Sequence, residues 1–333
     1  MPRAFAFDPA RRLGLGAAAL LAAGIAAGLA TPAQAQTAAK PIRLIVPFPA
    51  GGTADVLPRI LAEKIHAQSP GAMLVDNRAG AGGNIGAEAV FRAPPDGTML
   101  LVSPPGPIAI NQFLFPKLGF DPNQWVPITV LATVPNVIAV SPKLAVASVA
   151  ELINHLKAHP DKVSFASQGN GSTSHLTASL FMSLTQTTMT HIPYKGTAPA
   201  LVDLMGGQVD VFFDNIASSA PQHLGGKLRV LAVADEQRSA ALPNVPTFAE
   251  AGLPAMVAVT WFAAVAPPGT PADVSAALHK QFVDALQDAD VKRRFAEQGA
   301  MPRGWSQERT GQFFKTEREK WSKVIKAANV KME

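Results

Sequence analysis

The sequence predicts an α/β protein with mainly parallel sheets, organised in two domains. Short apolar runs alternate with segments of 3.6-residue periodicity along most of the 333 residues. Continuous apolar strands are typical of parallel sheets that helices cover on both faces. The composition, 48% hydrophobic and 16% charged, is that of a globular chain rather than a disordered one.

Residues 1–35 are predicted to be a signal peptide. Two arginines precede an apolar stretch at 13–30, and small residues follow at Ala33 and Ala35, the positions that signal peptidase requires. A transmembrane anchor is the alternative, but alanine and glycine insert weakly and the cleavage site follows directly. We therefore expect cleavage after Ala35 and export to the bacterial periplasm. About 298 residues then remain, enough for two domains that each have a core.

Composition excludes several classes of function. The chain has no cysteine, which removes disulfides, thiolate nucleophiles, zinc–thiolate sites and iron–sulfur clusters. The formal charge is +5, and about +2 of it belongs to residues 1–35. The remaining surplus gives no argument for a nucleic-acid partner.

The expected strands and helices alternate in order along the chain. The strands are expected at Ile42–Val46, Met73–Val75, Met99–Val102, Val137–Val140, Val163–Ala166, Val209–Phe213, Leu228–Val233 and Val259–Ala266. Helical periodicity is found around Leu57–Ile65, Val149–Leu156, Leu176–Leu184, Val274–Leu286 and Phe314–Ile325.

Two similar strand–proline–helix units indicate where the chain crosses between lobes. Residues 137–142 and 262–267 share this pattern, and each is followed by a helix. We therefore predict a first part of lobe 1 at 36–137, lobe 2 at 138–259, and a return to lobe 1 with C-terminal helices at 260–333.

A glycine-rich turn follows the first strand and is the first candidate site. Its helix is expected to begin near Asp55, with Asp55 or Thr53 as the N-cap. The amides of Gly51, Gly52 and Thr53 would then lie at the positive end of the helix dipole, where no side chain hinders an anion. A plain βα turn is the alternative, because such turns are frequent in this fold class.

A second loop of the same design follows the strand at 163–166. Residues 167–171 lead into an amphipathic helix for which Ser172 is the predicted N-cap. The hydroxyls of Thr173 and Ser174 are expected to add hydrogen-bond donors at the helix mouth. Two such helix N-termini, one in each lobe, predict a cleft for a carboxylate.

Catalytic interpretations have less support in the sequence. There is no G-x-S-x-G, no H-E-x-x-H and no nucleotide-binding G-x-x-x-x-G-K-[ST] motif. Ser172 or Ser174 beside His175, with Asp214 as the orienting carboxylate, is a hypothetical triad. Residues adjacent at a helix start usually diverge, however. The sequence predicts no catalytic residue.

The histidine pair at 155 and 159 has a spacing that can share a metal ion. His159 precedes a proline at the end of a helix, where an imidazolium is favoured by the dipole, so capping is the preferred interpretation. No metal and no cofactor are predicted.

The loops and several further motifs resemble the solute-binding proteins of tripartite tricarboxylate transporters, also called Bug receptors. The matching motifs include PFPAGGTAD at 47–55, GAGGNIG at 80–86, GSTSH at 171–175, PYKG at 193–196 and FDN at 213–215. They run through nearly the whole chain after residue 35. The resemblance implies a type II periplasmic-binding-protein fold, in which two α/β lobes joined by crossing strands close on a ligand.

The resemblance also implies a receptor function without catalysis. The family typically binds small carboxylates and delivers them to a membrane partner with a large and a small subunit. We expect a monomer with no nucleic-acid partner. The predicted ligand-binding residues are Phe48, Ala50, Gly51, Gly52, Thr53, Asp55, Ser103, Ser172, Thr173, Ser174, His175, Tyr194, Lys195, Gly196, Asp214 and Asn215.

One loop departs from the family pattern. Residues 103–106 read Ser-Pro-Pro-Gly, which is stiffer than the expected small polar loop, and Pro105 and Pro107 have no N–H to donate.

Alternatives stay open at this point. A carboxylate sensor subunit of a two-component system has the same fold and ligand, and a periplasmic serine hydrolase is a further alternative. The ligand class also stays open among mono-, di- and tricarboxylates, amino acids and aromatic acids, because cleft volume decides it.

Overall fold

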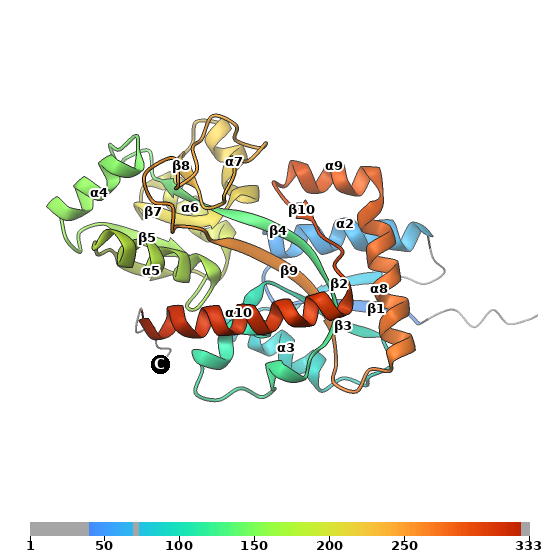
Figure 1. The fold of residues 1–333 in the computed structure, drawn as a ribbon. Helices are drawn as coiled ribbons and strands as arrows, with labels where there is room; N and C mark the ends of the chain where they lie inside the picture. The colour runs from blue at the N-terminus through green and yellow to red at the C-terminus, as the bar shows by residue number, and fades with distance from the viewer. Residues whose placement is uncertain (1–39, 69–72, 328–333) are drawn as a thin grey trace, which may run out of the picture. The chain divides into compact units, whose positions relative to one another are not determined.

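The computed structural model describes residues 40–68 and 73–327, all within one compact unit of the chain (Figure 1). The predicted signal peptide lies outside these residues. The strands are β1 (Ile42–Val46), β2 (Met73–Asn77), β3 (Met99–Ser103), β4 (Val126–Val140), β5 (Ser164–Ser167), β6 (Thr190–Pro193), β7 (Val211–Asn215), β8 (Arg229–Val233), β9 (Val259–Ala266) and β10 (Met301–Pro302). The helices are α2 (Thr53–Gln68), α3 (Asn84–Phe91), α4 (Val149–Ala158), α5 (Thr173–Thr185), α6 (Thr197–Gly206), α7 (Ile216–Leu224), α8 (Ala272–Gln287), α9 (Ala289–Glu297) and α10 (Gln307–Ala327). Short helical turns are η1 (Ala81–Gly83), η2 (Gly106–Ile110), η3 (Asn111–Phe113) and η4 (Pro122–Gln124).

The strands form one mixed sheet in the order β2-β1-β3-β9-β4-β7-β5-β6, and β8 and β10 each pair with β4. The outer pairings are parallel, whereas every pairing of β4 and β9 is antiparallel. The prediction of mainly parallel sheets was therefore wrong: five of the nine pairings in the described ranges are antiparallel. The reason is that β4 and β9 carry the chain between the two halves of the sheet in opposite directions.

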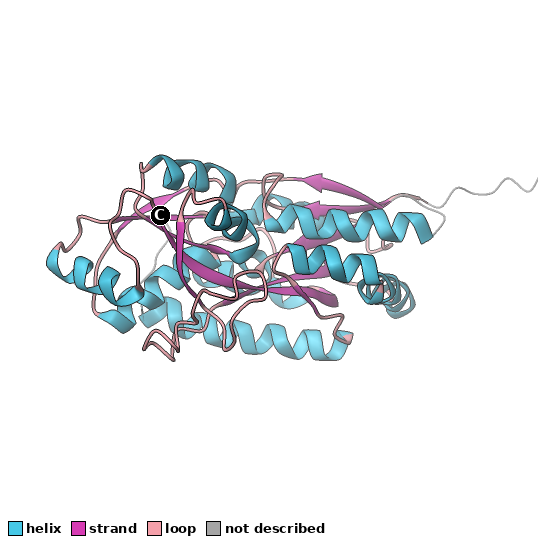
Figure 2. Cartoon of the chain, turned by 90° about the horizontal axis from the view of Figure 1, so that it is seen from above, coloured by secondary structure: helices cyan, strands magenta, loops and turns pink. Residues whose placement is uncertain are grey.

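β4 joins the two halves. Up to Pro135 it pairs with β9, and from Asn136 on it pairs with β7 and β8. We call lobe 1 the elements β1–β3, β10, α2, α3 and α8–α10, and lobe 2 the elements β5–β8 and α4–α7; β4 and β9 belong to both. Helices lie on both sides of the strands (Figure 2). The boundaries at 138 and 259 stay a prediction.

Prolines explain why most of β4 was not expected. The strand runs for 15 residues and contains Pro127 and Pro135, which cannot donate to a neighbouring strand. Pro127 lies at a bulge, and Pro135 lies where the partner strand changes. The edge strand β6 was also missed, because its Thr-His-Ile-Pro sequence has no continuous apolar run.

Apolar clusters hold each lobe together and connect the two. In lobe 1, Ile45 and Leu101 pack with Trp261 and Phe314, while Phe165, Phe181 and Phe213 belong to the core of lobe 2. A smaller cluster joins the lobes at one side. Its members are Ile110, Leu114, Leu176, Trp321 and Ile325. The last turns of α10 therefore reach α5 across the lobe boundary (Figure 1).

Candidate functional site

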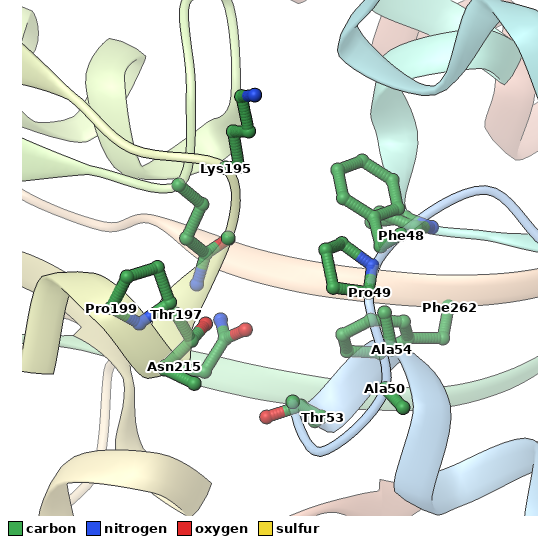
Figure 3. A pocket seen from close by; sticks show the side chains of 15 residues that line it. Phe48, Pro49, Ala50, Thr53, Ala54, Lys195, Thr197, Pro199, Asn215 and Phe262 are labelled. Carbon is green, nitrogen blue, oxygen red and sulfur yellow. The ribbon is translucent and has the colours of Figure 1, made fainter. Parts of the chain in front are cut away.

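A narrow cavity lies between the two lobes, where the loops after β1 and β6 face each other (Figure 3). We call it the inner cavity; its volume is about 40 Å³. Its lining residues are Phe48, Pro49, Ala50, Gly52, Thr53, Ala54, Pro104, Gln168, Lys195, Gly196, Thr197, Ala198, Pro199, Asn215 and Phe262. Seven of the predicted ligand-binding residues are among them. These are Phe48, Ala50, Gly52, Thr53, Lys195, Gly196 and Asn215.

The first loop forms much as predicted, but its aspartate has a different role. Helix α2 begins at Thr53, so neither Thr53, its first residue, nor Asp55, its third, is the N-cap; Gly52, whose carbonyl accepts from the Val56 N–H, occupies that position. The buried Asp55 carboxylate accepts a hydrogen bond from the Gly51 N–H at 3.0 Å and from Asn77 Nδ2 and Arg59 Nε, both at 2.9 Å. The Gly51 amide is therefore not free for a ligand, contrary to expectation. Asp55 instead holds the turn in shape.

The pKa of Asp55 reflects these bonds. Burial by itself would raise the pKa, but the hydrogen bonds from Arg59, Gly51 and Asn77 outweigh it and lower the pKa below the usual value. Asp55 is therefore ionised at neutral pH. The turn keeps its shape, with Gly52 and Thr53 facing the cavity.

The second loop forms the predicted N-cap of α5, but its other hydroxyls form hydrogen bonds within the protein. Ser172 caps α5 by accepting from the His175 N–H. Thr173 Oγ1 lies 2.9 Å from Thr260 Oγ1, and the Ser174 hydroxyl donates to the Phe213 carbonyl. The prediction that Thr173 and Ser174 add free donors at the helix mouth was therefore wrong. Their partners come from distant strands that a local pattern does not reveal.

The second loop lines a neighbouring cavity of about 30 Å³, which we call the second cavity. Ser172 and Thr173 lie on its wall together with Phe48 and Pro104. Ser174 and His175 line neither cavity.

Two stacked histidines support this loop. The rings of His175 and His191 stack with centroids 4.0 Å apart, and His191 stacks in turn on Phe165 at 4.7 Å. His175 Nδ1 accepts from the Gly171 N–H, and His191 Nε2 lies 2.7 Å from Ser167 Oγ. Burial lowers the pKa of His175 to about 4; burial and the neighbouring His175 lower the pKa of His191 to about 3. Both rings are neutral at pH 7.

The hypothetical triad is not formed. Ser174 donates to a backbone carbonyl, and His175 Nδ1 is occupied by a backbone amide. Asp214 accepts from Gln168 and Ser219 and not from a histidine. His159 is the C-cap of α4, as predicted, with Nδ1 3.0 Å from the His155 carbonyl oxygen.

The third loop divides its residues between the cavities. Lys195 and Gly196 line the inner cavity, and Tyr194 and Lys195 line an outer cavity of about 470 Å³. The exposed Lys195 side chain points away from Thr53 and Asn215 (Figure 3). The Tyr194 hydroxyl donates to Asp203 Oδ2 at 2.6 Å, and burial together with this bond raises the pKa of Tyr194 to about 12. The hydroxyl therefore has no proton to donate to a ligand, and contact with a ligand would use the ring, the backbone or the phenolic oxygen as an acceptor.

Asp214, a predicted ligand-binding residue, is fully buried and lines none of the three cavities, although the next residue, Asn215, lines the inner cavity. Asp214 accepts from Gln168 Nε2 at 3.0 Å and Ser219 Oγ at 2.9 Å. Burial raises the pKa of Asp214 to about 7, although hydrogen bonds from Ser219, Gln168 and Thr197 act in the opposite direction.

Ser103 is buried, and its hydroxyl donates to the neighbouring Pro104 carbonyl at 2.9 Å. Pro104 is the residue of this loop that faces the inner cavity. The stiff loop therefore contributes an apolar wall.

Three important lining residues were missed: Gln168, Thr197 and Phe262. Gln168 touches all three cavities. Its position directly after a strand was a signal available in the sequence. Thr197 begins α6, directly after the predicted Gly196.

The loop chemistry and the fold agree with known proteins. A profile of the "Tripartite tricarboxylate transporter family receptor" matches residues 57–330. This chain belongs to that receptor family. The receptor is 39% identical to Protein BugT of Bordetella pertussis over 309 residues, which cover 92% of this chain and 95% of BugT.

Solved structures support the same assignment. The R. palustris protein Rpa4515 with adipate matches the receptor with a TM-score of 0.85 at 35% identity, covering 88% of this chain and 99% of that one. MatC from Rhodopseudomonas palustris with bound malate matches with a TM-score of 0.81 at 30% identity, covering 86% and 99%.

These comparisons confirm the fold prediction of a two-lobed solute-binding protein. Receptors of this family are periplasmic, and the family and its structural neighbours are binding proteins rather than enzymes. Between residues 40 and 327, leaving aside 69–72, no helix is long and apolar enough to cross a membrane.

Proposed function

We propose that this receptor captures a small organic carboxylate in the inner cavity and delivers it, as a monomer, to a membrane transporter with a large and a small subunit. Export by a signal peptide cleaved after Ala35 would place it in the periplasm.

Converging helix N-termini carry the proposal. Thr53 begins α2 directly after Gly52, Thr197 begins α6 directly after Gly196, and Asn215 precedes α7; all five line the inner cavity. The first amides of a helix have no partner within the helix, and the dipole makes this end positive. The cavity thus offers a carboxylate several N–H donors from both lobes.

The partners of α2 differ from the expectation. The sequence predicts a cleft between the N-termini of α2 and α5. In the structure, the lobe 2 helices whose N-termini lie at the inner cavity are α6 and α7. The prediction from the sequence and the proposal from the structure nevertheless agree that the carboxylate binds at Gly52 and Thr53.

Contact between the lobes supports capture by closure. Thr53 Oγ1 of lobe 1 lies 3.3 Å from Ser218 Oγ of lobe 2. A ligand held at this point touches both lobes, so its binding favours the closed arrangement.

Isothermal titration calorimetry of the exported protein tests this proposal. Succinate, malate, aspartate, adipate, citrate and benzoate would be titrated separately, and saturable binding of at least one is expected. Intact mass of the exported protein checks the cleavage site.

Substitutions at two glycines test where the ligand binds. Gly52→Asp places a negative charge in the cavity, and a Cβ at Gly52 meets Thr197 only at an ordinary 3.7 Å, so the variant should fold and lose binding by about 100-fold or more. Gly206→Asp in α6, where a Cβ meets open space, is the matched control and should bind normally. Equal affinity of Gly52→Asp and the control would exclude the inner cavity.

A further inference from the structure

We propose that the ligand carries a hydrogen-bond donor, a hydroxyl or ammonium group, near its carboxylate, and that Asp214 is the positioning residue that selects for it. This inference rests on the proposed function. It is carried by three acceptor oxygens that lobe 2 presents to the inner cavity, on Gln168, Thr197 and Asn215.

A buried hydrogen-bond network fixes the orientation of the Asn215 amide. The Thr177 hydroxyl donates to the Thr173 carbonyl at 2.6 Å, so Thr177 Oγ1 must accept from Asn136 Nδ2 at 2.8 Å. Asn136 Oδ1 therefore points the other way, toward Asn215 and Thr260.

Both protons of Asn215 Nδ2 are used in this network. One is donated to Asn136 Oδ1 at 2.7 Å and the other to Thr260 Oγ1 at 2.9 Å. Asn215 is the N-cap residue of α7, but its side chain makes no capping hydrogen bond. Its Oδ1 has no hydrogen-bond donor in the described part of the chain, and the side chain lines the inner cavity beside Thr197 (Figure 3).

Asp214 orients the Gln168 amide and lies beside Thr197. An ionised carboxylate can only accept, so Gln168 Nε2 directs one proton to Asp214 Oδ1 at 3.0 Å, and the neighbouring Thr197 hydroxyl contributes to lowering the pKa of Asp214. Thr197 Oγ1 accepts no hydrogen bond among the described residues, and Thr197 lines the cavity, so its lone pairs are available there. Gln168 Oε1 accepts no hydrogen bond within the described ranges and is available to a ligand. One N–H of Gln168 Nε2 is available as well.

The acceptors disfavour a ligand that has only carboxylate oxygens. A carboxylate can be satisfied by the amides at the start of α2, but it offers no proton to Asn215 or Thr197. Buried acceptors left without a donor weaken binding. The Asp214 charge, which has no cationic partner among the described residues, disfavours a second carboxylate at this wall still further. A neighbouring hydroxyl or ammonium group satisfies the acceptors.

Matched ligand pairs test this inference by calorimetry. Malate and aspartate would be compared with succinate, 2-hydroxyadipate and 2-aminoadipate with adipate, and 3-hydroxybenzoate with benzoate. Titrations are made at pH 8, where Asp214 is ionised. Within the series that binds, the member with the donor should bind at least about tenfold more tightly.

The variant Asp214→Asn distinguishes a role of Asp214 in selecting the ligand from a role in supporting the structure. The new amide can donate to Gln168 Oε1 or Thr197 Oγ1, which turns donors toward the cavity. The preference for the donor-bearing ligand should therefore fall about tenfold or more, whereas a merely structural role would weaken both ligands equally. Thr197→Val, which removes one acceptor and keeps the side-chain shape, should reduce the same preference.

Asp210→Asn is the matched control, because the Asp210 carboxylate in lobe 2 accepts from the Ser164 amide and hydroxyl, both at 2.8 Å, away from the cavities. It should leave the preference unchanged. Equal affinity of malate, aspartate and succinate, with binding intact, would overturn this inference and keep the proposed function. An unchanged preference in folded Asp214→Asn would overturn the role of Asp214. Absence of binding by every ligand would overturn both proposals.

Discussion

The turn between β1 and α2 and the turn between β5 and α5 both lead from a buried strand through glycines to a helix N-terminus. In the first, Gly52 and Thr53 face the inner cavity. In the second, Thr173 and Ser174 bond to Thr260 and Phe213. The second helix mouth, although rich in hydroxyls, thus offers a ligand fewer free donors, because tertiary structure supplies partners for Thr173 and Ser174.

One glycine from each turn shows the same contrast between the two turns. A Cβ at Gly52 would meet Thr197 at 3.7 Å, which is ordinary contact, whereas one at Gly171 would lie 2.1 Å from Leu114 Cδ1. Gly171 also has a φ of +72°, which disfavours any side chain. The first glycine leaves room for a ligand, and the second lets the lobes pack.

The largest expected effect is therefore the difference in stability between variants at Gly171 and Gly52. Gly171→Ala should lower the free energy of unfolding by about 2–3 kcal/mol, through backbone strain and overpacking against Leu114. Gly52→Ala should change it by less than about 0.5 kcal/mol. Urea denaturation of both variants measures the difference, and equal stability would show that the two turns are equivalent.

The histidine stack of the second loop should make stability depend on pH. Both pKa values are lowered on folding, so the unfolded chain takes up protons first as the pH falls below about 6.5. This contribution is present at pH 7 and is lost toward pH 4. His191→Phe, which keeps the ring stack, should reduce the loss of stability between pH 7 and pH 5 by about 1 kcal/mol after allowance for partial solvent screening.

Denaturation at the two pH values, for wild type and variant, gives the comparison. An identical pH dependence would mean that folding does not lower the pKa of His191.

Removing the N-cap of α5 should have a smaller effect, on stability and not on affinity. Ser172→Ala should lower the free energy of unfolding by about 1 kcal/mol, because the His175 amide loses its acceptor. Affinity for the carboxylate should change by less than about twofold, since the inner cavity does not include Ser172. A large loss of affinity with unchanged stability would move the second loop into the binding site.

The smallest effect is expected at the rim of the cavity. Lys195→Gln removes an exposed charge that attracts anions at a distance, so affinity should fall about two- to threefold at low salt. At high salt the difference should vanish. A loss that persists at high salt would indicate direct contact between Lys195 and the ligand.

Local patterns predicted what local interactions determine. Strands β1 and β9 have the predicted bounds, Ser172 caps its helix, and Gly52 and Thr53 lie at the cavity. Each of these depends on residues within a few positions in the chain. The resemblance to a receptor family then supplied the two-lobed fold.

Contacts between distant residues account for what was missed. Thr173 meets Thr260 across 87 positions, and Asn215 meets Asn136 across 79. Neither bond has a signature in the sequence around either residue. For the same reason, periodicity alone did not reveal that α6, rather than α5, faces α2.

A crystal structure of the receptor with its tightest carboxylate tests the central claim most directly. The account predicts a carboxylate within hydrogen-bond distance of the Gly52 or Thr53 amide, in contact with both lobes. A carboxylate bound at the mouth of α5, with the inner cavity free of ligand, would contradict it.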